Sequence, residues 1–223
     1  MLLNKNDDIE LHIDSVSLTG SGVGRYNGLA VFVPATAPGD IIEAHIIKAK
    51  KSYAVGKCTK IIKPSPDRTD NDCPAYPGCG GCSFRHMSYG AELKLKSDAV
   101  SDAFSRIGGL DVELKPIIGA DSPDGYRNKA QYPVSKDGAV GFYRARTHEV
   151  IECEQCLLVK PEADAAAEAL REYMQSCRVA GYDEKTGRGL VRHLYVRSNA
   201  AGESLVCVLV NGDKLPKEDR LVT

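Results

Sequence analysis

The chain has 223 residues, of which 43% are hydrophobic and 26% charged, a composition that excludes a mainly disordered protein. Its formal net charge is −1, so any nucleic-acid site has to be a local basic patch. There is no apolar run long enough to span a bilayer and no apolar core of a secretion signal at the N-terminus. We therefore expect a cytoplasmic protein without a membrane partner.

Residues 9–63 predict a small all-β domain. The segment IELHIDSVS alternates apolar and polar residues, and later segments rich in β-branched residues are separated by turn signals. About five strands in so short a stretch indicate a closed OB-like barrel, which we place at residues 1–64. Gly20, Gly22 and Gly24 resemble a phosphate-binding loop, but a strand rather than a helix follows them, so we predict a hairpin bend instead.

A second, α+β domain is expected at residues 65–223, after a proline-containing linker at residues 63–67. The apolar spacing predicts a helix over residues 89–107 with an apolar face formed by Leu93, Val100, Phe104 and Ile107. A β-hairpin over residues 130–152, a helix over residues 161–179 and two strands, LVRHLYVRS and SLVCVLVNG, follow. The last residues, KEDRLVT, resemble the beginning of a helix, so we expect the second domain to be incomplete and the chain to be the front part of a longer protein.

The cysteine pattern points to a metal site. Three of the eight cysteines, Cys73, Cys79 and Cys82, lie within ten residues among three glycines, and Cys153 and Cys156 follow after the hairpin. In a reducing compartment such clustered thiols are typical metal ligands. A zinc ribbon would use the two C-x2-C pairs and leave Cys73 unused, whereas a [4Fe–4S] cluster would use the tight triple and one later cysteine. Spacing alone leaves both metals open and favours iron–sulfur.

The remaining cysteines are predicted to be structural. Cys58 falls in a barrel strand, Cys177 on the apolar face of a helix, and Cys207 within the apolar run LVCVLV. We expect all three to be core residues without a catalytic role.

The motifs resemble one enzyme family. CPAYPGCGGCSFRHMSYGAELKLKSDAVSDAFSRIGG, GYRNKAQYPV, GFYRARTHEVIECEQCLL and RHLYVRS are similar to segments of SAM-dependent 23S rRNA (uracil-5-)-methyltransferases that carry an iron–sulfur cluster. GSGVGR and FVPATAPGD within residues 9–63 resemble the N-terminal TRAM domain of that family. The resemblance implies a [4Fe–4S] cluster on Cys73, Cys79, Cys82 and Cys156, and methylation of C5 of a uridine, with ribosomal RNA favoured over tRNA.

The resemblance also implies a limit. The family transfers the methyl group with a Rossmann-like domain that binds S-adenosyl-L-methionine, and this chain has no glycine loop between a strand and a helix. We therefore expect the Rossmann-like methyltransferase domain to be absent, the chain by itself to be inactive, and no catalytic residue to lie within residues 1–223. The alternative is a non-catalytic RNA-binding metalloprotein with iron–sulfur or zinc.

Two basic segments are candidate RNA contacts. The stretch 41–63 holds six lysines and one acidic residue, and we select Lys48, Lys50 and Lys51, although a solvated lysine-rich strand edge would look the same. In the second segment, cations alternate with rings, as recognition of unstacked bases requires. From it we select Arg127, Asn128, Lys129, Phe142 and Arg144, and the resemblance places the matching family segments in the RNA cleft. No protein partner is implied.

Overall fold

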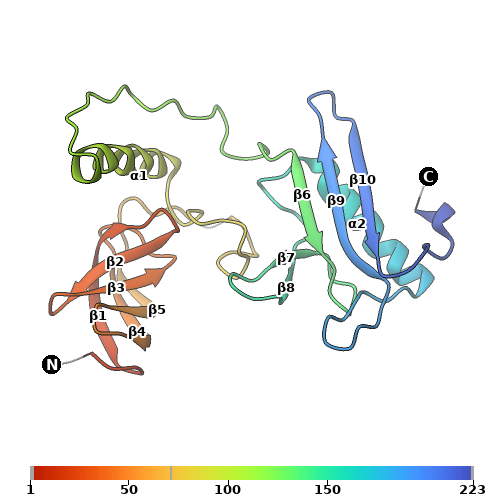
Figure 1. Ribbon diagram of the computed structural model, residues 1–223, viewed down its shortest axis with the longest axis horizontal. Coiled ribbons are helices and arrows are strands. Elements are labelled where there is room, and N and C mark those ends of the chain that lie inside the picture. Colours follow the sequence, from red (N-terminus) through yellow and green to blue (C-terminus); the bar gives the residue numbers. More distant parts are fainter. Residues whose placement is uncertain (1–2, 71, 222–223) are drawn as a thin grey trace. The chain divides into compact units, whose positions relative to one another are not determined.

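The computed structural model describes residues 3–70 and 72–221. The chain divides into two compact units (Figure 1). The first, called the barrel unit, comprises residues 1–72 and 82–119, and the second, called the sheet unit, comprises residues 73–81 and 120–223. Residues 65–72 and 82–119 thus lie with the barrel rather than with the second unit, where the sequence placed them.

Five strands form the closed barrel: β1 (Asp8–Val16), β2 (Ser21–Tyr26), β3 (Leu29–Pro34), β4 (Ile41–Ala49) and β5 (Tyr53–Lys63). Their order is β1-β2-β3-β5-β4, and antiparallel pairing of β1 with β4 closes the barrel. Alternate residues point inward, so that Ile13, Val31 and Ile42 are completely buried. The expected five-stranded barrel is present. Gly24 lies in β2, where a Cβ would collide with the carbonyl oxygen of His12, so close strand packing explains this glycine.

The expected linker is packed onto the barrel instead of connecting two domains freely. Asp40 is completely buried and accepts hydrogen bonds from the backbone N–H of Ala37 (2.7 Å) and of Ser65 (2.8 Å). The Arg68 guanidinium donates to both Asp40 oxygens, with Nε at 2.8 Å and Nη2 at 2.8 Å. Burial alone would raise the pKa of Asp40, but the Arg68 and backbone hydrogen bonds outweigh it and lower that pKa below its usual value. The buried carboxylate therefore fixes residues 65–68 to the barrel.

His86 gives the barrel unit a predictable pH dependence. Its ring is buried, with Nε2 3.1 Å from the carbonyl oxygen of Thr36, and burial lowers its pKa below the usual 6.5. His86 binds a proton less readily in the folded state than in the unfolded state. The contribution of its neutral ring to the free energy of unfolding is therefore complete above about pH 6.5, and it is lost as the pH falls through the lower pKa of the folded state. We expect the urea midpoint to fall less between about pH 7.5 and about pH 5 in His86→Gln than in the wild type. The exposed His12 is the control. An equal fall of the urea midpoint in His12→Gln and His86→Gln would mean that His86 is not the source of the pH dependence.

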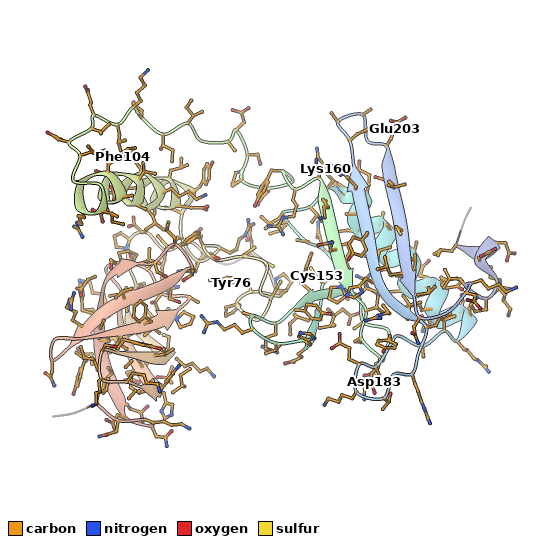
Figure 2. All side chains as sticks on the ribbon, viewed as in Figure 1. Tyr76, Phe104, Cys153, Lys160, Asp183 and Glu203 are labelled. Atoms are coloured by element: carbon orange, nitrogen blue, oxygen red, sulfur yellow. The ribbon has the colours of Figure 1, made fainter. Side chains whose placement is uncertain are left out.

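Helix α1 (Tyr89–Asp102) begins at Ser88, whose Oγ accepts the N–H of Ala91 at 3.3 Å, and continues as a π-helical turn, Ala103–Ile107. The predicted helical segment is present, but the apolar face predicted for it is not buried. No residue of the helix is buried, and Phe104 and Ile107 are 39% and 87% exposed. Figure 2 labels Phe104 at the end of this helical segment. Within its unit the helix packs through Ala91 and Leu95, near its first turns, so the periodic residues farther along remain uncovered by the residues described.

The sheet unit contains an antiparallel sheet of order β10-β9-β6, formed by β6 (Lys129–Pro133), β9 (Val191–Ser198) and β10 (Ser204–Val210). Helix α2 (Pro161–Cys177) packs against one face of this sheet (Figure 1). The helix predicted over residues 161–179 is confirmed, and its buried residues, including Ala163, Ala167 and Leu170, recur at helical spacing on the side that faces the core. A short 3-10 helix, Glu218–Arg220, follows near the end of the described chain.

The expected hairpin over residues 130–152 was wrong in its pairing. β6 pairs with β9, and the two further strands, β7 (Gly141–Tyr143) and β8 (Val150–Glu152), pair with each other as a separate ribbon. Between β6 and β7, an isolated antiparallel bridge joins Val134 and Val140. Long-range pairing of β6 with β9 buries Ala130 and Tyr132 against α2, which a local hairpin would not do. Among the described residues, no helix is long and apolar enough to cross a membrane.

Candidate functional site

The sheet of the second unit has one open face. Residues that point away from α2 form three rows across β6, β9 and β10. The rows are Lys129–Arg197–Leu205, Gln131–Tyr195–Cys207 and Pro133–His193–Leu209. Lys129, Gln131 and Arg197 are exposed, and Leu205 is 72% exposed. We call these residues the open sheet face; it combines two cations, an amide and a ring, the groups that hold phosphates and unstacked bases.

The residues selected from the second basic segment occupy different environments in the structure. Lys129 lies on the open sheet face, and the backbone of Asn128 accepts the N–H of Ser198 at 2.9 Å beside it. Phe142 packs against Tyr132, with ring centroids 4.9 Å apart, and so belongs to the edge of the core. Arg144 forms an exposed ion pair with Glu149, Nε to Oε2 2.7 Å, which lessens its charge toward a ligand.

Arg127 lies near the cysteines rather than on the sheet. Its backbone N–H donates to the carbonyl oxygen of Leu158 at 2.8 Å, in the loop that follows Cys156. Its guanidinium also acts electrostatically on Cys79. The structure therefore places Arg127 at the cysteine loops, where a cation favours thiolates.

Tyr195 and Arg197 were missed as candidate residues. In RHLYVRS, His193, Tyr195 and Arg197 alternate with the buried Leu194 and Val196. That alternation is a visible signal for a polar face on one side of a strand.

The barrel unit carries its own basic patch. Lys48, Lys50 and Lys51 are exposed at the β4–β5 turn, where Lys50 donates its backbone N–H to the carbonyl oxygen of Tyr53 at 2.9 Å. The Lys48 ammonium lies 5.8 Å from the Tyr53 ring centroid, and Phe32 meets the same ring edge-on at 6.0 Å. Cations beside rings suit a single-stranded nucleic acid better than a bare lysine edge would.

Cys73, Cys79 and Cys156 lie in the sheet unit and interact electrostatically. The backbone N–H of Gly81 donates to the sulfur of Cys79 at 3.3 Å, and the N–H of Gly80 donates to the carbonyl oxygen of Tyr143 at 2.9 Å. The glycine loop thus aims an N–H at a thiol and is attached to the end of β7. Burial raises the pKa of Cys79 above its usual value.

Helix α2 holds the second pair of cysteines. Asp164 accepts the backbone N–H of Cys156 at 3.0 Å and the hydroxyl of Tyr132 at 3.2 Å, while Arg171 donates to the carbonyl oxygen of Cys153 at 2.7 Å. Cys153 is buried and its thiol donates to the carbonyl oxygen of Gln155 at 3.3 Å. Its interaction with Cys156 lowers the pKa of Cys156 and raises that of Cys153, so Cys153 is the neutral thiol of the pair.

Clustered thiols that accept backbone N–H groups are suited to binding a metal as thiolates, although the described side chains are not grouped as a complete metal site. In the part of the chain that the structure describes, no three His, Cys, Asp or Glu side chains are grouped so as to hold a metal ion. The thiols of Cys79 and Cys156 nevertheless accept backbone N–H groups, as cluster-bound sulfurs commonly do. Cys82 follows Cys79 by three residues at the start of the next segment of the barrel unit.

The remaining cysteines, Cys58, Cys177 and Cys207, do not belong to the candidate ligands. Cys58 and Cys177 are partly buried and pack against the two cores, as expected for structural residues. The expectation that Cys207 is a core residue was wrong, because β10 is an edge strand and Cys207 is exposed on the open sheet face. A continuous apolar run predicts burial on both sides, but here one side remains open.

Comparison with known proteins finds one domain match and several relatives that extend over nearly the whole chain. Residues 4–59 match the model of the TRAM domain. A protein of Halalkalibacterium halodurans named as an RNA methyltransferase is 37% identical over 99% of this chain and 49% of its own length. One of Clostridium tetani is 38% identical over the same shares. The chain is therefore homologous to RNA methyltransferases and spans about half the length of these relatives.

A solved structure has the same fold. The tRNA (uracil-54, C5)-methyltransferase of Pyrococcus abyssi, in complex with S-adenosyl-L-homocysteine, matches with a TM-score of 0.72 and 23% identity. The match covers 95% of this chain and 48% of that protein.

These matches correct two expectations. We expected a chain without the methyltransferase fold that is inactive by itself because its catalytic domain is missing. The fold of a methyltransferase instead extends over 95% of the chain, and proteins named RNA methyltransferases match 99% of it. The missing glycine loop therefore did not justify the prediction that this chain lacks a methyltransferase fold. We no longer expect the chain to be inactive by itself.

Proposed function

We propose that the protein methylates C5 of a uridine in RNA, with S-adenosyl-L-methionine as the methyl donor. The observation that carries this proposal is homology to RNA methyltransferases over 99% of the chain. The solved neighbour is named as a uracil C5 enzyme, which supports the position of the methyl group. The open sheet face and the lysine patch of the barrel supply the RNA contacts that such a reaction needs.

The proposed role of the described residues is to hold RNA. A stacked base does not present C5 and C6 to a nucleophile, so the target uridine has to be in a loop or turned out of its stack. Lys129 and Arg197, paired across adjacent strands, neutralise phosphates, and Tyr195 in the next row offers a ring to an unstacked base. In the chemistry that the resemblance implies, a thiolate adds to C6, C5 takes the methyl group, and loss of the C5 proton and the thiol restores the base.

The RNA target proposed here is 23S rRNA. The resemblance of the cysteine and YRNKAQ motifs to the rRNA enzymes with an iron–sulfur cluster supports it, whereas the solved neighbour is named as a tRNA enzyme. We propose that the same motifs bind a [4Fe–4S] cluster through Cys73, Cys79, Cys82 and Cys156. The hydrogen bonds to the sulfurs of Cys79 and Cys156 support this ligand set.

Release of tritium tests the reaction directly. Methylation replaces the hydrogen on C5, so RNA transcribed with [5-³H]uridine should release tritium into water when S-adenosyl-L-methionine is present. The assay uses the whole protein encoded by the gene, with 23S rRNA and tRNA transcripts in parallel. We expect release from 23S rRNA. RNA that binds but never releases tritium would instead support a non-catalytic RNA-binding metalloprotein.

The open sheet face makes a separate prediction. Arg197→Ala removes one exposed cation from the central strand of this face, so affinity for a structured RNA should fall roughly fivefold, and the slope of log affinity against log salt should decrease by roughly one. Filter binding at two salt concentrations measures both. Arg220→Ala, which removes an exposed arginine elsewhere in the unit, is the control. Equal effects of the two substitutions would mean that the face has no special role.

A further inference from the structure

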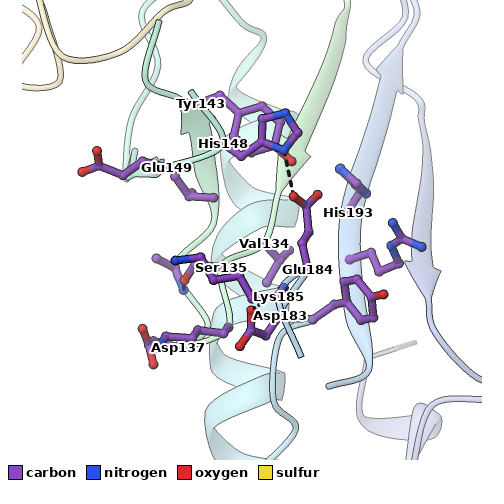
Figure 3. Close-up of a pocket in the computed structure, with 15 residues that line it drawn as sticks. Val134, Ser135, Asp137, Tyr143, His148, Glu149, Asp183, Glu184, Lys185 and His193 are labelled. Carbon is purple, nitrogen blue, oxygen red and sulfur yellow. Dashed lines mark hydrogen bonds and ion pairs between the residues drawn. The ribbon is translucent and has the colours of Figure 1, made fainter. Parts of the chain in front are cut away.

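A pocket in the sheet unit remains outside the roles assigned so far (Figure 3). Its volume is about 700 Å³, and its walls come from the segments 134–139, 143–150 and 182–185 and from the start of β9. This size is within the usual range for small-ligand sites. The pocket is therefore large enough for a nucleobase.

Rings form much of the pocket wall. Tyr143 and His148 stack at one end, with centroids 5.2 Å apart and planes inclined by 28° (Figure 3). Arg192 lies 4.4 Å from the Tyr182 ring centroid. A ring pair and a guanidinium plane are both surfaces on which a base can stack.

The charges around the pocket argue against a ligand that is mainly phosphate. Three cationic side chains line it together with four anionic ones: Lys136, Lys185, Arg192, Asp137, Glu149, Asp183 and Glu184. A surplus of carboxylates repels phosphate but accepts hydrogen bonds from amino groups. The balance favours a planar, neutral ligand with N–H donors.

Two of the four carboxylates, Asp137 and Glu184, keep an oxygen open to such a ligand within the described chain, and Glu184 is the one held beside the ring pair through His148. The Asp183 oxygens accept Lys185 N–H at 2.9 Å and the Thr186 hydroxyl at 3.1 Å, and Glu149 is paired with Arg144. Glu184 uses Oε2 for His148, 2.8 Å away, while the structure records no hydrogen bond for Oε1 within the described chain. Its side chain is 50% exposed at the pocket, so this oxygen is available to a ligand.

The pocket adjoins the open sheet face. His193 lines the pocket and also belongs to the last row of that face, and its ring lies 6.2 Å from that of Tyr195. We propose that the pocket binds one unpaired adenine, cytosine or guanine of the RNA strand that lies on the open sheet face. This inference rests on the proposed RNA substrate and adds a base preference. Uracil has no exocyclic amino group, and its single N3–H lies between two carbonyl oxygens that a carboxylate repels, so uracil is disfavoured and the pocket is distinct from the site of the target base.

Binding of short RNAs tests this preference. The probes are oligouridines of about eight nucleotides in which one central residue is A, C, G or U, and affinity is measured by fluorescence anisotropy with the whole protein. We expect the three amino-bearing probes to bind about tenfold more tightly than oligouridine. Glu184→Gln, whose amide can also donate to uracil, should remove most of this difference, and His148→Ala should weaken all probes.

Glu172→Gln is the matched control, because Glu172 is exposed on α2 and outside the pocket. Circular dichroism verifies that each variant is folded. Equal affinity for the four probes, no binding of any probe, or the same loss in Glu172→Gln as in Glu184→Gln would overturn the proposal. Tritium release reports separately on the proposed reaction, so a base preference without release would contradict that reaction alone.

Discussion

Replacing Asp40 by alanine should destabilise the barrel unit by about 3 kcal/mol, the low end of the cost of breaking a buried ion pair. The substitution leaves the Arg68 guanidinium, 17% exposed, without its carboxylate, and removes the acceptor of the Ala37 and Ser65 N–H groups. Thermal unfolding followed by circular dichroism should show the midpoint lowered by roughly 10–20 °C for a domain of this size.

Asp72→Ala is the control for this effect. Asp72 also forms a two-pronged pair with an arginine, Arg85, at 2.9 and 2.8 Å, but its side chain is 61% exposed. An exposed pair of this kind contributes under about 1 kcal/mol. A similar loss of stability in both variants would mean that the buried carboxylate does not fix residues 65–68 to the barrel.

Replacing Cys73 by serine should remove nearly all iron from the anaerobically purified protein. With the cluster intact, the wild type should be brown and contain about four irons per chain. Cys153→Ser should retain iron, because the proposed ligand set does not use Cys153, whose buried thiol donates to the Gln155 carbonyl oxygen. Metal analysis and the visible absorption spectrum measure both variants.

The competing zinc ribbon gives the reverse result, since it uses Cys153 and leaves Cys73 unused. Cys207→Ser, an exposed cysteine on the open sheet face, is the control and should keep its iron. Stoichiometric zinc without iron in the wild type would refute the iron–sulfur cluster.

Local patterns predicted the parts of the fold that depend on one buried face. Ile9, Leu11 and Ile13 alternate along β1 and are all buried, and the stripe of α2 faces the core as its period requires. The failures depend on contacts far away in sequence. Pairing of β6 with β9, the open side of β10 at Cys207 and the uncovered end of α1 at Phe104 are decided by which elements meet, and no local period contains that information.

The candidate site likewise contains residues that a local pattern predicts and residues that only long-range strand pairing brings together. Lys129 was predictable from a basic segment, while Tyr195 and Arg197 lie on a strand about 65 residues later and joined it through sheet pairing. Phe142 carried the right residue type but faces Tyr132 in the core. The pocket beside His193 combines several separate segments, so composition along any one of them could not reveal it.

Nucleoside analysis of cellular RNA tests the proposed function most directly. Total 23S rRNA and tRNA from a strain that lacks the gene, and from the same strain with the gene restored, are digested and compared by mass spectrometry. We predict that the deletion removes one 5-methyluridine from 23S rRNA and that the restored gene returns it. Unchanged 5-methyluridine in both RNA classes would contradict the proposed uracil C5 methylation, and a loss confined to tRNA would contradict the proposed target.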